Sequence, residues 1–298
     1  MDGSKSVFAI LAFGELGESS RISLDSILKI HDSTICVAGD SLGLTWVRKN
    51  LSASQTRQLC THQIPEKDLL ELNLLPTRYS TYSNFGQERF IKLTTFKWFL
   101  ISDILQRHPN LDYVIFSDLD VLWNNSIEDS LEFYFSNSRV NVAGQLDWNT
   151  ESVEIKKYLC PGIMIWKNSD SSISMVEDIR GFHETKLLDD KNFPDDKAIN
   201  SWMQIDKNHE KITFLSPNDF IIGHRLIALL AETSNFRLKN FKAFHANYCV
   251  GEVRKRFRIK MLNSVLKFPN LRFFVAGLIL ADIAIVKLRQ TSPRMFNH

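Results

Sequence analysis

The sequence lacks the motifs of several common protein classes. Its four cysteines (Cys36, Cys60, Cys160 and Cys249) stand far apart without Cys-x-x-Cys spacing, which argues against a disulfide framework or a zinc knuckle and favours a reducing compartment. Neither a Gly-x-Gly-x-x-Gly sequence nor a P-loop is present, so neither kind of nucleotide site is indicated. The net charge is only +2, so no overall nucleic-acid-binding surface is expected.

Long hydrophobic runs are also missing. The apolar run at 7–13 is short and no small-residue cleavage site follows it, so we interpret it as a buried strand and not as a secretory signal. The apolar segment 273–286 is too short to cross a bilayer and contains Asp282. With 44% hydrophobic residues in 298, the chain has the composition of a globular protein with a substantial core. We expect a cytoplasmic protein.

Strand-like and helix-like segments alternate along the chain, which predicts an α/β fold. The continuous apolar run at 112–116 is typical of a central strand covered on both faces. The expected strands are 6–13, 33–38, 112–116, 140–143, 163–166, 212–215 and 241–244, and the expected helices are 23–30, 89–106, 174–182 and 196–205.

An Asp-x-Asp pair, Asp118 and Asp120, follows that central strand directly. The carboxyl end of a strand is where open α/β sheets bind ligands. Two carboxylates so close together repel each other and lose hydration, so they need a compensating cation. Carboxylate oxygens suit Mg²⁺ or Mn²⁺, and such an ion can hold a diphosphate. We therefore favour a metal site over a simple turn cap.

Two enzyme classes carry Asp-x-Asp at such a position: sugar-nucleotide glycosyltransferases, and aspartate-nucleophile phosphatases of the haloacid dehalogenase type. The phosphatase motif usually begins its domain and continues with Thr or Val two residues after the second Asp. Here more than a hundred residues precede Asp118, and Leu122 stands at that later position. Asp195-Asp196 could imitate the late acidic motif of the phosphatases, so this class remains an alternative. A second alternative is an inactive module that binds a glycan or a nucleotide sugar.

From about 89 to 262, the order of short motifs resembles the nucleotide-diphospho-sugar transferase family, which includes plant rhamnogalacturonan xylosyltransferase-like enzymes. The resemblance implies a GT-A-like fold, with a Rossmann-like, mostly parallel central sheet flanked by helices. It also implies that Asp120 ligates the metal directly and that Asp118 shares the metal or bonds the ribose. His245 follows a short strand and would be the third protein ligand.

The resemblance extends to residues around the donor. Lys97 lies in the helix before the acidic strand, where family members carry a basic residue that reaches the sugar nucleotide. Gly162 would let the backbone approach the donor sugar. Asp196 and Asn200 resemble the outer residues of the family's Asp-Gln-x-x-x-Asn, on a helix lining the sugar, whereas Lys197 replaces the usual Gln.

Three more residues complete the family's carboxyl-terminal His-x-Asn, Gly, Lys pattern. Asn247 would belong to the donor site, and Gly251 would permit a tight loop over the diphosphate. Lys255 would neutralise the phosphates as the leaving group gains charge.

The implied reaction is transfer of a sugar from a nucleoside diphosphate donor to a hydroxyl of a glycan or glycolipid. Uridine is the default base, retention of anomeric configuration is expected, and Mn²⁺ or Mg²⁺ is the expected cofactor. Asp196, as a sugar or acceptor contact, and Lys255 are the residues expected to act in catalysis.

The carboxyl-terminal part is the most asymmetric segment. It is basic and free of acidic residues over 254–272, and the apolar run 273–286 follows. This pattern predicts either peripheral attachment to an anionic membrane surface through 254–286, or a helix that packs on the domain with a solvated basic face. We divide the chain into a transferase domain, 1–262, and a helical tail, 263–298.

Overall fold

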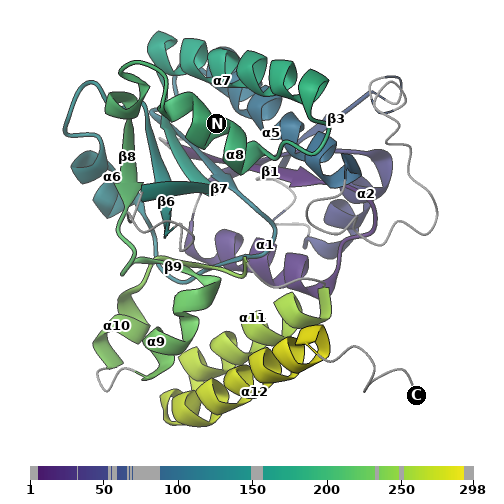
Figure 1. The fold of residues 1–298 in the computed structure, drawn as a ribbon, viewed down its shortest axis with the longest axis vertical. Helices are drawn as coiled ribbons and strands as arrows, with labels where there is room; N and C mark the ends of the chain where they lie inside the picture. The colour runs from purple at the N-terminus through teal and green to yellow at the C-terminus, as the bar shows by residue number, and fades with distance from the viewer. Residues whose placement is uncertain are drawn as a thin grey trace.

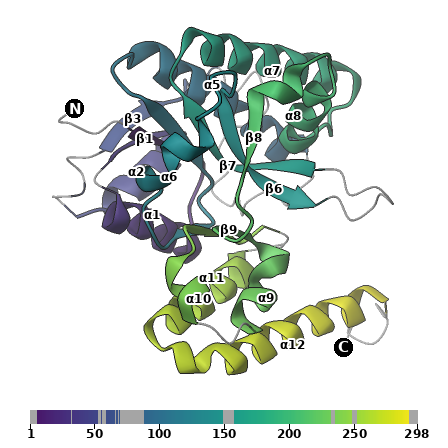
Figure 2. The same cartoon turned by 90° about the vertical axis from the view of Figure 1, so that its left-hand side faces the viewer.

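The computed structural model describes residues 6–31, 33–52, 55, 59–65, 67, 69, 88–148, 157–231, 235–247 and 252–291. A large sheet lies between two layers of helices in the upper part of the molecule (Figure 1). Short helices and the long carboxyl-terminal pair form a smaller lower part, which is seen from the side in Figure 2.

The large sheet has seven strands, and its topology positions the site. β7 runs antiparallel to both of its neighbours, and all other neighbouring pairs are parallel. The predicted mostly parallel α/β sheet is therefore confirmed. In spatial order the strands are β3 (Leu59–Gln63), β2 (Thr34–Gly39), β1 (Ser6–Ala12), β4 (Tyr113–Ser117), β7 (Lys157–Lys167), β6 (Val142–Trp148) and β8 (Ile212–Leu215).

Helices bury both faces of this sheet. In β1, Val7 and Ala9 belong to one hydrophobic cluster and Phe8 and Ile10 to the other, because successive side chains of a strand point to opposite faces. The first cluster includes residues of α5 (Glu88–Arg107), α7 (Asp170–Asp189) and α8 (Asp195–Met203), and the second includes residues of α1 (Glu18–Ile30), α2 (Ser41–Asn50) and α6 (Glu128–Tyr134).

A second, three-stranded sheet joins distant parts of the chain. β10 (Ala243–His245) pairs antiparallel with β5 (Val121–Trp123) and parallel with β9 (Phe220–Ile222). Because β5 follows β4 after one turn, this pairing brings the carboxyl-terminal part of the chain to the Asp-x-Asp segment.

The carboxyl-terminal helices pack on the underside of the small sheet. A third hydrophobic cluster joins Leu122 and Phe244 of this sheet to Leu262 and Ile279 of the two long helices. These helices are α11 (Glu252–Lys267) and α12 (Arg272–Thr291), and two short helices, α9 (Leu226–Ala231) and α10 (Asn235–Asn240), lie beside them.

Basic residues of α11 are paired within the protein. Arg254 and Arg258 lie 3.6 and 3.7 Å from Asp282 of α12, and Lys260 lies 2.6 Å from Glu18 of α1. These ion pairs accord with the interpretation of a helix packed on the domain. None of the helices in the described ranges is long and apolar enough to cross a bilayer.

The sequence placed the start of α1 too late, at 23 instead of Glu18. The reason is that serine fills much of the buried face of this helix, including Ser19, Ser20 and Ser23, so the apolar spacing is absent there. Ser26 uses its hydroxyl oxygen to accept a hydrogen bond of 3.0 Å from the backbone N–H of Trp123. Small side chains allow α1 to pack closely against β5.

His31 is a buried histidine that must stay neutral. Its ring centroid lies 4.7 Å from that of Phe8 and 5.3 Å from that of Trp123, and neither ring nitrogen has a hydrogen-bond partner. Burial, assisted by the charge of Lys242, lowers its pKa to about 4.

We expect the free energy of unfolding to fall as the pH drops from about 6.5 to 4, because only the unfolded chain then binds a proton at His31. The slope from this residue approaches about 1.4 kcal/mol per pH unit. Urea unfolding at several pH values should show that His31→Phe flattens this dependence and that replacement of the exposed His209 by Gln does not. Equal slopes in the wild type and His31→Phe would contradict the prediction.

Candidate active site

The turn after β4 presents the two carboxylates of the Asp-x-Asp pair. Asp118 donates its backbone N–H to the carbonyl of Gly162 on β7, at 2.8 Å. The indole N–H of Trp123 on β5 donates a hydrogen bond of 3.1 Å to the hydroxyl of Ser117 at the end of β4. The turn is therefore fixed on both sides, and both side chains emerge at the carboxyl end of a central strand.

His245 lies opposite this turn. Its Nε2 is 3.2 Å from Oδ1 of Asp120 and 3.8 Å from Oδ2 of Asp118. The three side chains offer ligand atoms that all lie within 4.8 Å of one another. Sequence reasoning proposed these three residues as ligands, and the structure places them together.

Gln145 orients the His245 ring, a role that the sequence did not indicate. The side-chain N–H group of Gln145 donates to the carbonyl of Ile221 at 3.3 Å, so its carbonyl oxygen faces Nδ1 of His245 at 2.9 Å. Nδ1 therefore donates to Gln145, and Nε2 faces the carboxylates, as is usual for a metal-binding histidine. Gln145 is fully buried on β6 beside a register irregularity, and the available signal was a polar residue close to the expected strand 140–143.

Gly162 contacts the same histidine. A Cβ atom at this position would lie 2.1 Å from Cε1 of His245. The structure thus shows a steric reason for glycine here, namely the imidazole of His245. The predicted approach of Gly162 to the donor sugar remains a prediction.

Neighbouring charges shift the pKa values of the three clustered residues in different directions. Burial opposes ionisation of Asp120, but Lys255, whose Nζ lies 2.7 Å from Oδ2, and His245 outweigh it and hold the pKa of Asp120 below its usual range. For Asp118, burial and the neighbouring Asp120 outweigh Lys97 and raise the pKa. For His245, burial is outweighed mainly by Asp120, so its pKa lies well above the usual value. Asp118 and Asp120, although two residues apart, therefore differ in their tendency to ionise.

Lys97 is buried instead of open to solvent, with 2% of its surface exposed. Its ammonium pairs with Asp195, donates to the carbonyl of Pro161 at 3.2 Å and lies 4.8 Å from the centre of the Phe116 ring. Burial opposes its charge, but Asp195 and Asp118 outweigh this effect and raise its pKa. Lys97 therefore supplies a buried positive charge that acts on Asp118. Its contact with a nucleotide stays a prediction.

The predicted site residues of α8 differ in their burial and in their contacts. Asn200 binds the backbone of Leu159 on β7 through two hydrogen bonds of 2.8 Å, so its amide is used within the protein. Asp196 is half-buried and accepts a hydrogen bond of 3.3 Å from Tyr158. Lys197 is exposed, and its ammonium lies 4.8 Å from the centre of the Phe193 ring.

Two further predicted residues lie after β10. Asn247 accepts a hydrogen bond of 2.7 Å from the backbone N–H of Gly223 and donates to the sulfur of Cys160 at 3.7 Å. Gly251, predicted to cover the diphosphate, and Cys249 lie outside the described residues.

The donor set fits a divalent cation. Two carboxylates and one imidazole nitrogen suit Mg²⁺ or Mn²⁺, and a histidine ligand favours Mn²⁺ of the two. A bound cation would also balance the charge that Lys255 now balances at Asp120. The residues therefore fit a divalent metal ion of the predicted kind.

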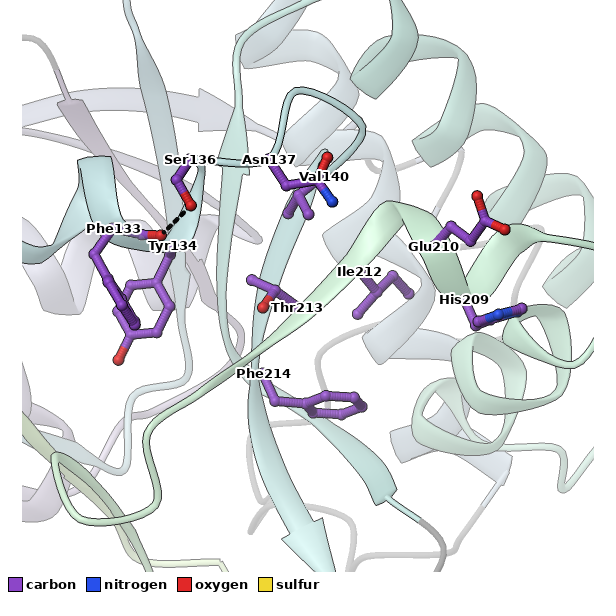
Figure 3. Close-up of a pocket in the computed structure, with 10 residues that line it drawn as sticks. All are labelled: Phe133, Tyr134, Ser136, Asn137, Val140, His209, Glu210, Ile212, Thr213 and Phe214. Atoms are coloured by element: carbon purple, nitrogen blue, oxygen red, sulfur yellow. Dashed lines mark hydrogen bonds between the residues drawn. The ribbon is translucent and has the colours of Figure 1, made fainter.

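A separate pocket of about 440 Å³ lies along the edge strand β8 (Figure 3). Two of its polar groups already have partners: Glu210 pairs with Arg139 at 3.0 Å, and the hydroxyl of Tyr134 accepts a hydrogen bond from the backbone N–H of Ser216 at 3.1 Å. The pocket contains none of the predicted site residues, so the candidate active site is the cluster of Asp118, Asp120 and His245.

Solved structures of glycosyltransferases share this fold. The galactosyltransferase LgtC, in complex with donor and acceptor sugar analogues, superimposes with a TM-score of 0.56 at 11% identity, over 88% of this chain and 95% of that one. Mouse xyloside xylosyltransferase 1 superimposes with a TM-score of 0.52 at 12% identity, over 82% and 98%. GlyE of Streptococcus pneumoniae TIGR4 gives 0.51 at 11%, over 88% and 63%.

Sequence comparison assigns the family directly. No curated protein matches the sequence. The family model for nucleotide-diphospho-sugar transferases, however, matches residues 54–259, which is more than half of the chain. The assignment argues against the phosphatase alternative. With the GT-A-like fold and the Asp-Asp-His cluster, it establishes that the chain belongs to the nucleotide-diphospho-sugar transferase family and is a glycosyltransferase.

Proposed function

We propose that this enzyme transfers a sugar from a UDP-sugar to a hydroxyl of a glycan or glycolipid, with retention of anomeric configuration. The observation that carries the proposal is the group of ligand atoms from Asp118, Asp120 and His245, within 4.8 Å of one another at the end of β4. These three residues would hold Mn²⁺ or Mg²⁺. The names of the neighbouring structures, which include donor and acceptor sugar analogues and a xylosyltransferase, support the substrate class.

The chain supplies fixed positive charge for a diphosphate. When bound, the divalent ion would neutralise the diphosphate and improve it as a leaving group. Lys255, a third exposed beside Asp120, is near enough to share its charge with the phosphates. The buried ammonium of Lys97, which pairs with Asp195, stabilises the ionised form of Asp118 electrostatically. Such preorganised charge usually supplies the largest part of catalysis.

Asp196 is proposed to contact the donor sugar or the acceptor. It lies on the first turn of α8, next to Asp195, and Asp195 is linked through Lys97 to the metal-binding turn. Asn200 and Asn247 were predicted in the same donor site. Their hydrogen bonds within the protein support a role in shaping the site.

The setting of the enzyme is also a proposal. Cys36, Cys60 and Cys160 are free thiols, which supports the cytoplasm. On α12, Phe273, Phe274 and Leu280 are more than half exposed, which supports peripheral contact with a membrane surface.

The test of the function is calorimetric titration of the purified protein with UDP, with and without Mn²⁺. We expect binding that requires the metal, and slow metal-dependent hydrolysis of one UDP-sugar in a donor screen, followed by faster turnover when an acceptor is added. Binding of UDP without hydrolysis of any sugar nucleotide would favour the binding-module alternative. No metal-dependent binding of UDP or other nucleoside diphosphates would refute the proposal.

A further inference from the structure

Tyr158 connects β7 to the carboxylate of Asp196. The Tyr158 hydroxyl donates to Oδ2 of Asp196 at 3.3 Å. Burial and the nearby charge of Asp196 raise the pKa of Tyr158 far above its ordinary value, so the hydroxyl keeps its proton and acts only as the donor. The other oxygen of Asp196, Oδ1, accepts the backbone N–H of Lys197 at 2.8 Å. Both oxygens of Asp196 thus have a fixed partner.

Hydrogen bonds also join β7 and α8 at Leu159, the residue that follows Tyr158. Asn200, one helical turn after Asp196, binds both the N–H and the C=O of Leu159, which follows Tyr158 on β7. Asn200 also donates to the backbone carbonyl of Asp196 at 2.7 Å. The Tyr158 hydroxyl is therefore held at a set distance from the carboxylate, and this geometry does not depend on a surface loop.

Asp196 lies in surroundings that disfavour its negative charge. Burial and the charge of Asp195 raise its pKa, whereas the Lys197 backbone N–H, Tyr158 and Lys97 lower it in part. Asp195, its neighbour in the chain, is neutralised by Lys97. Among the described residues no salt bridge is formed by Asp196, and the Tyr158 hydroxyl is the side-chain group that donates a hydrogen bond to its carboxylate.

We propose that Tyr158 is a positioning residue that orients the carboxylate of Asp196 toward the sugar or the acceptor hydroxyl. The proposal rests on the proposed function, because it assumes that Asp196 contacts a substrate. Tyr158 itself does not contact the metal-binding group. Its loss should therefore affect turnover and leave nucleotide binding nearly unchanged.

The test compares Tyr158→Phe with Tyr113→Phe, a matched loss of a half-buried tyrosine hydroxyl far along the sheet. We expect Tyr158→Phe to lower kcat for transfer or donor hydrolysis roughly tenfold, as for loss of a hydrogen bond to a charged group. The acid limb of the kcat–pH profile should move to higher pH, because the carboxylate loses a donor that favours its ionised form. Tyr113→Phe should change neither quantity.

A double-mutant cycle shows whether Tyr158 acts through Asp196. In the Asp196→Asn background, Tyr158→Phe should cause little further loss of kcat. Unchanged kcat and pH profile in Tyr158→Phe, or fully additive losses in the cycle, would overturn the proposal. Metal-dependent UDP binding, measured in every variant, separates this outcome from failure of the proposed function, in which the wild type itself binds no UDP.

Discussion

Replacement of Asp120 by asparagine is expected to reduce glycosyl transfer by about a thousandfold, the upper range for removal of one preorganised electrostatic group. Asp120 is the contact shared by His245 at 3.2 Å and Lys255 at 2.7 Å. The neutral amide should weaken the predicted metal site, and it removes the carboxylate that pairs with buried His245 and half-buried Lys255. UDP titration in Mn²⁺ should show loss of metal-dependent binding together with the loss of turnover.

The matched control for this variant is Asp129→Asn. Asp129 lies on α6 with its side chain 84% exposed and 3.8 Å from Lys242, so its removal should change activity less than twofold, as is usual for exposed ion pairs. Circular dichroism should confirm that both variants are folded. Retention of metal-dependent UDP binding by Asp120→Asn would show that the metal site lies elsewhere.

The second large effect is expected for Gly162→Ala. The added methyl group would lie 2.1 Å from Cε1 of His245 and 2.8 Å from its Nε2, so the ring must leave its position between Gln145 and the carboxylates. Displacement of one ligand should weaken metal-dependent UDP binding by roughly a hundredfold, comparable to loss of an outer-shell partner. Titration with UDP at several Mn²⁺ concentrations measures this effect.

Gly181→Ala is the control for this substitution. No atom lies within 4 Å of a Cβ at Gly181 in the middle of α7, so this change should preserve activity and stabilise the protein by about 0.5–1 kcal/mol. Adding His245→Ala to Gly162→Ala should restore thermal stability, because the clashing ring is removed, but it should not restore activity. Full activity of Gly162→Ala would refute the steric argument.

Sequence reasoning predicted the fold correctly and selected three residues that cluster in the structure, because both predictions depend on local patterns. The buried strand before Asp118 is a continuous apolar run, and it becomes β4 at Tyr113–Ser117. The helix expected at 89–106 becomes α5 at Glu88–Arg107, because apolar residues recur there at helical spacing from Leu93 to Leu105. His245 was found through the Asn and Lys residues that follow it at family spacing.

The sequence did not predict the contacts between distant segments, because these contacts leave no local pattern. β5 and β9 have three residues each, too few for a periodic signal. The pairing of Lys97 with Asp195 and the binding of Asn200 to Leu159 join separate elements, so the sequence could identify these residues as polar but not name their partners. The basic residues of α11 suggested a helix face exposed to solvent or to a membrane. In the structure, Arg254, Arg258 and Lys260 form ion pairs with carboxylates on other helices.

The small sheet has a consequence for the order in which the enzyme matures. Its central strand, β10, brings His245 to Val121 and Asp120, and a hundred residues separate Gln145 from the histidine that it orients. During synthesis the amino-terminal part of the large sheet can form early, but a nascent chain that ends before β10 has two carboxylates and no third ligand. Pairings between such distant segments form late. If the three residues hold a metal as proposed, we therefore expect metal affinity to appear only when the chain has been synthesised as far as β10.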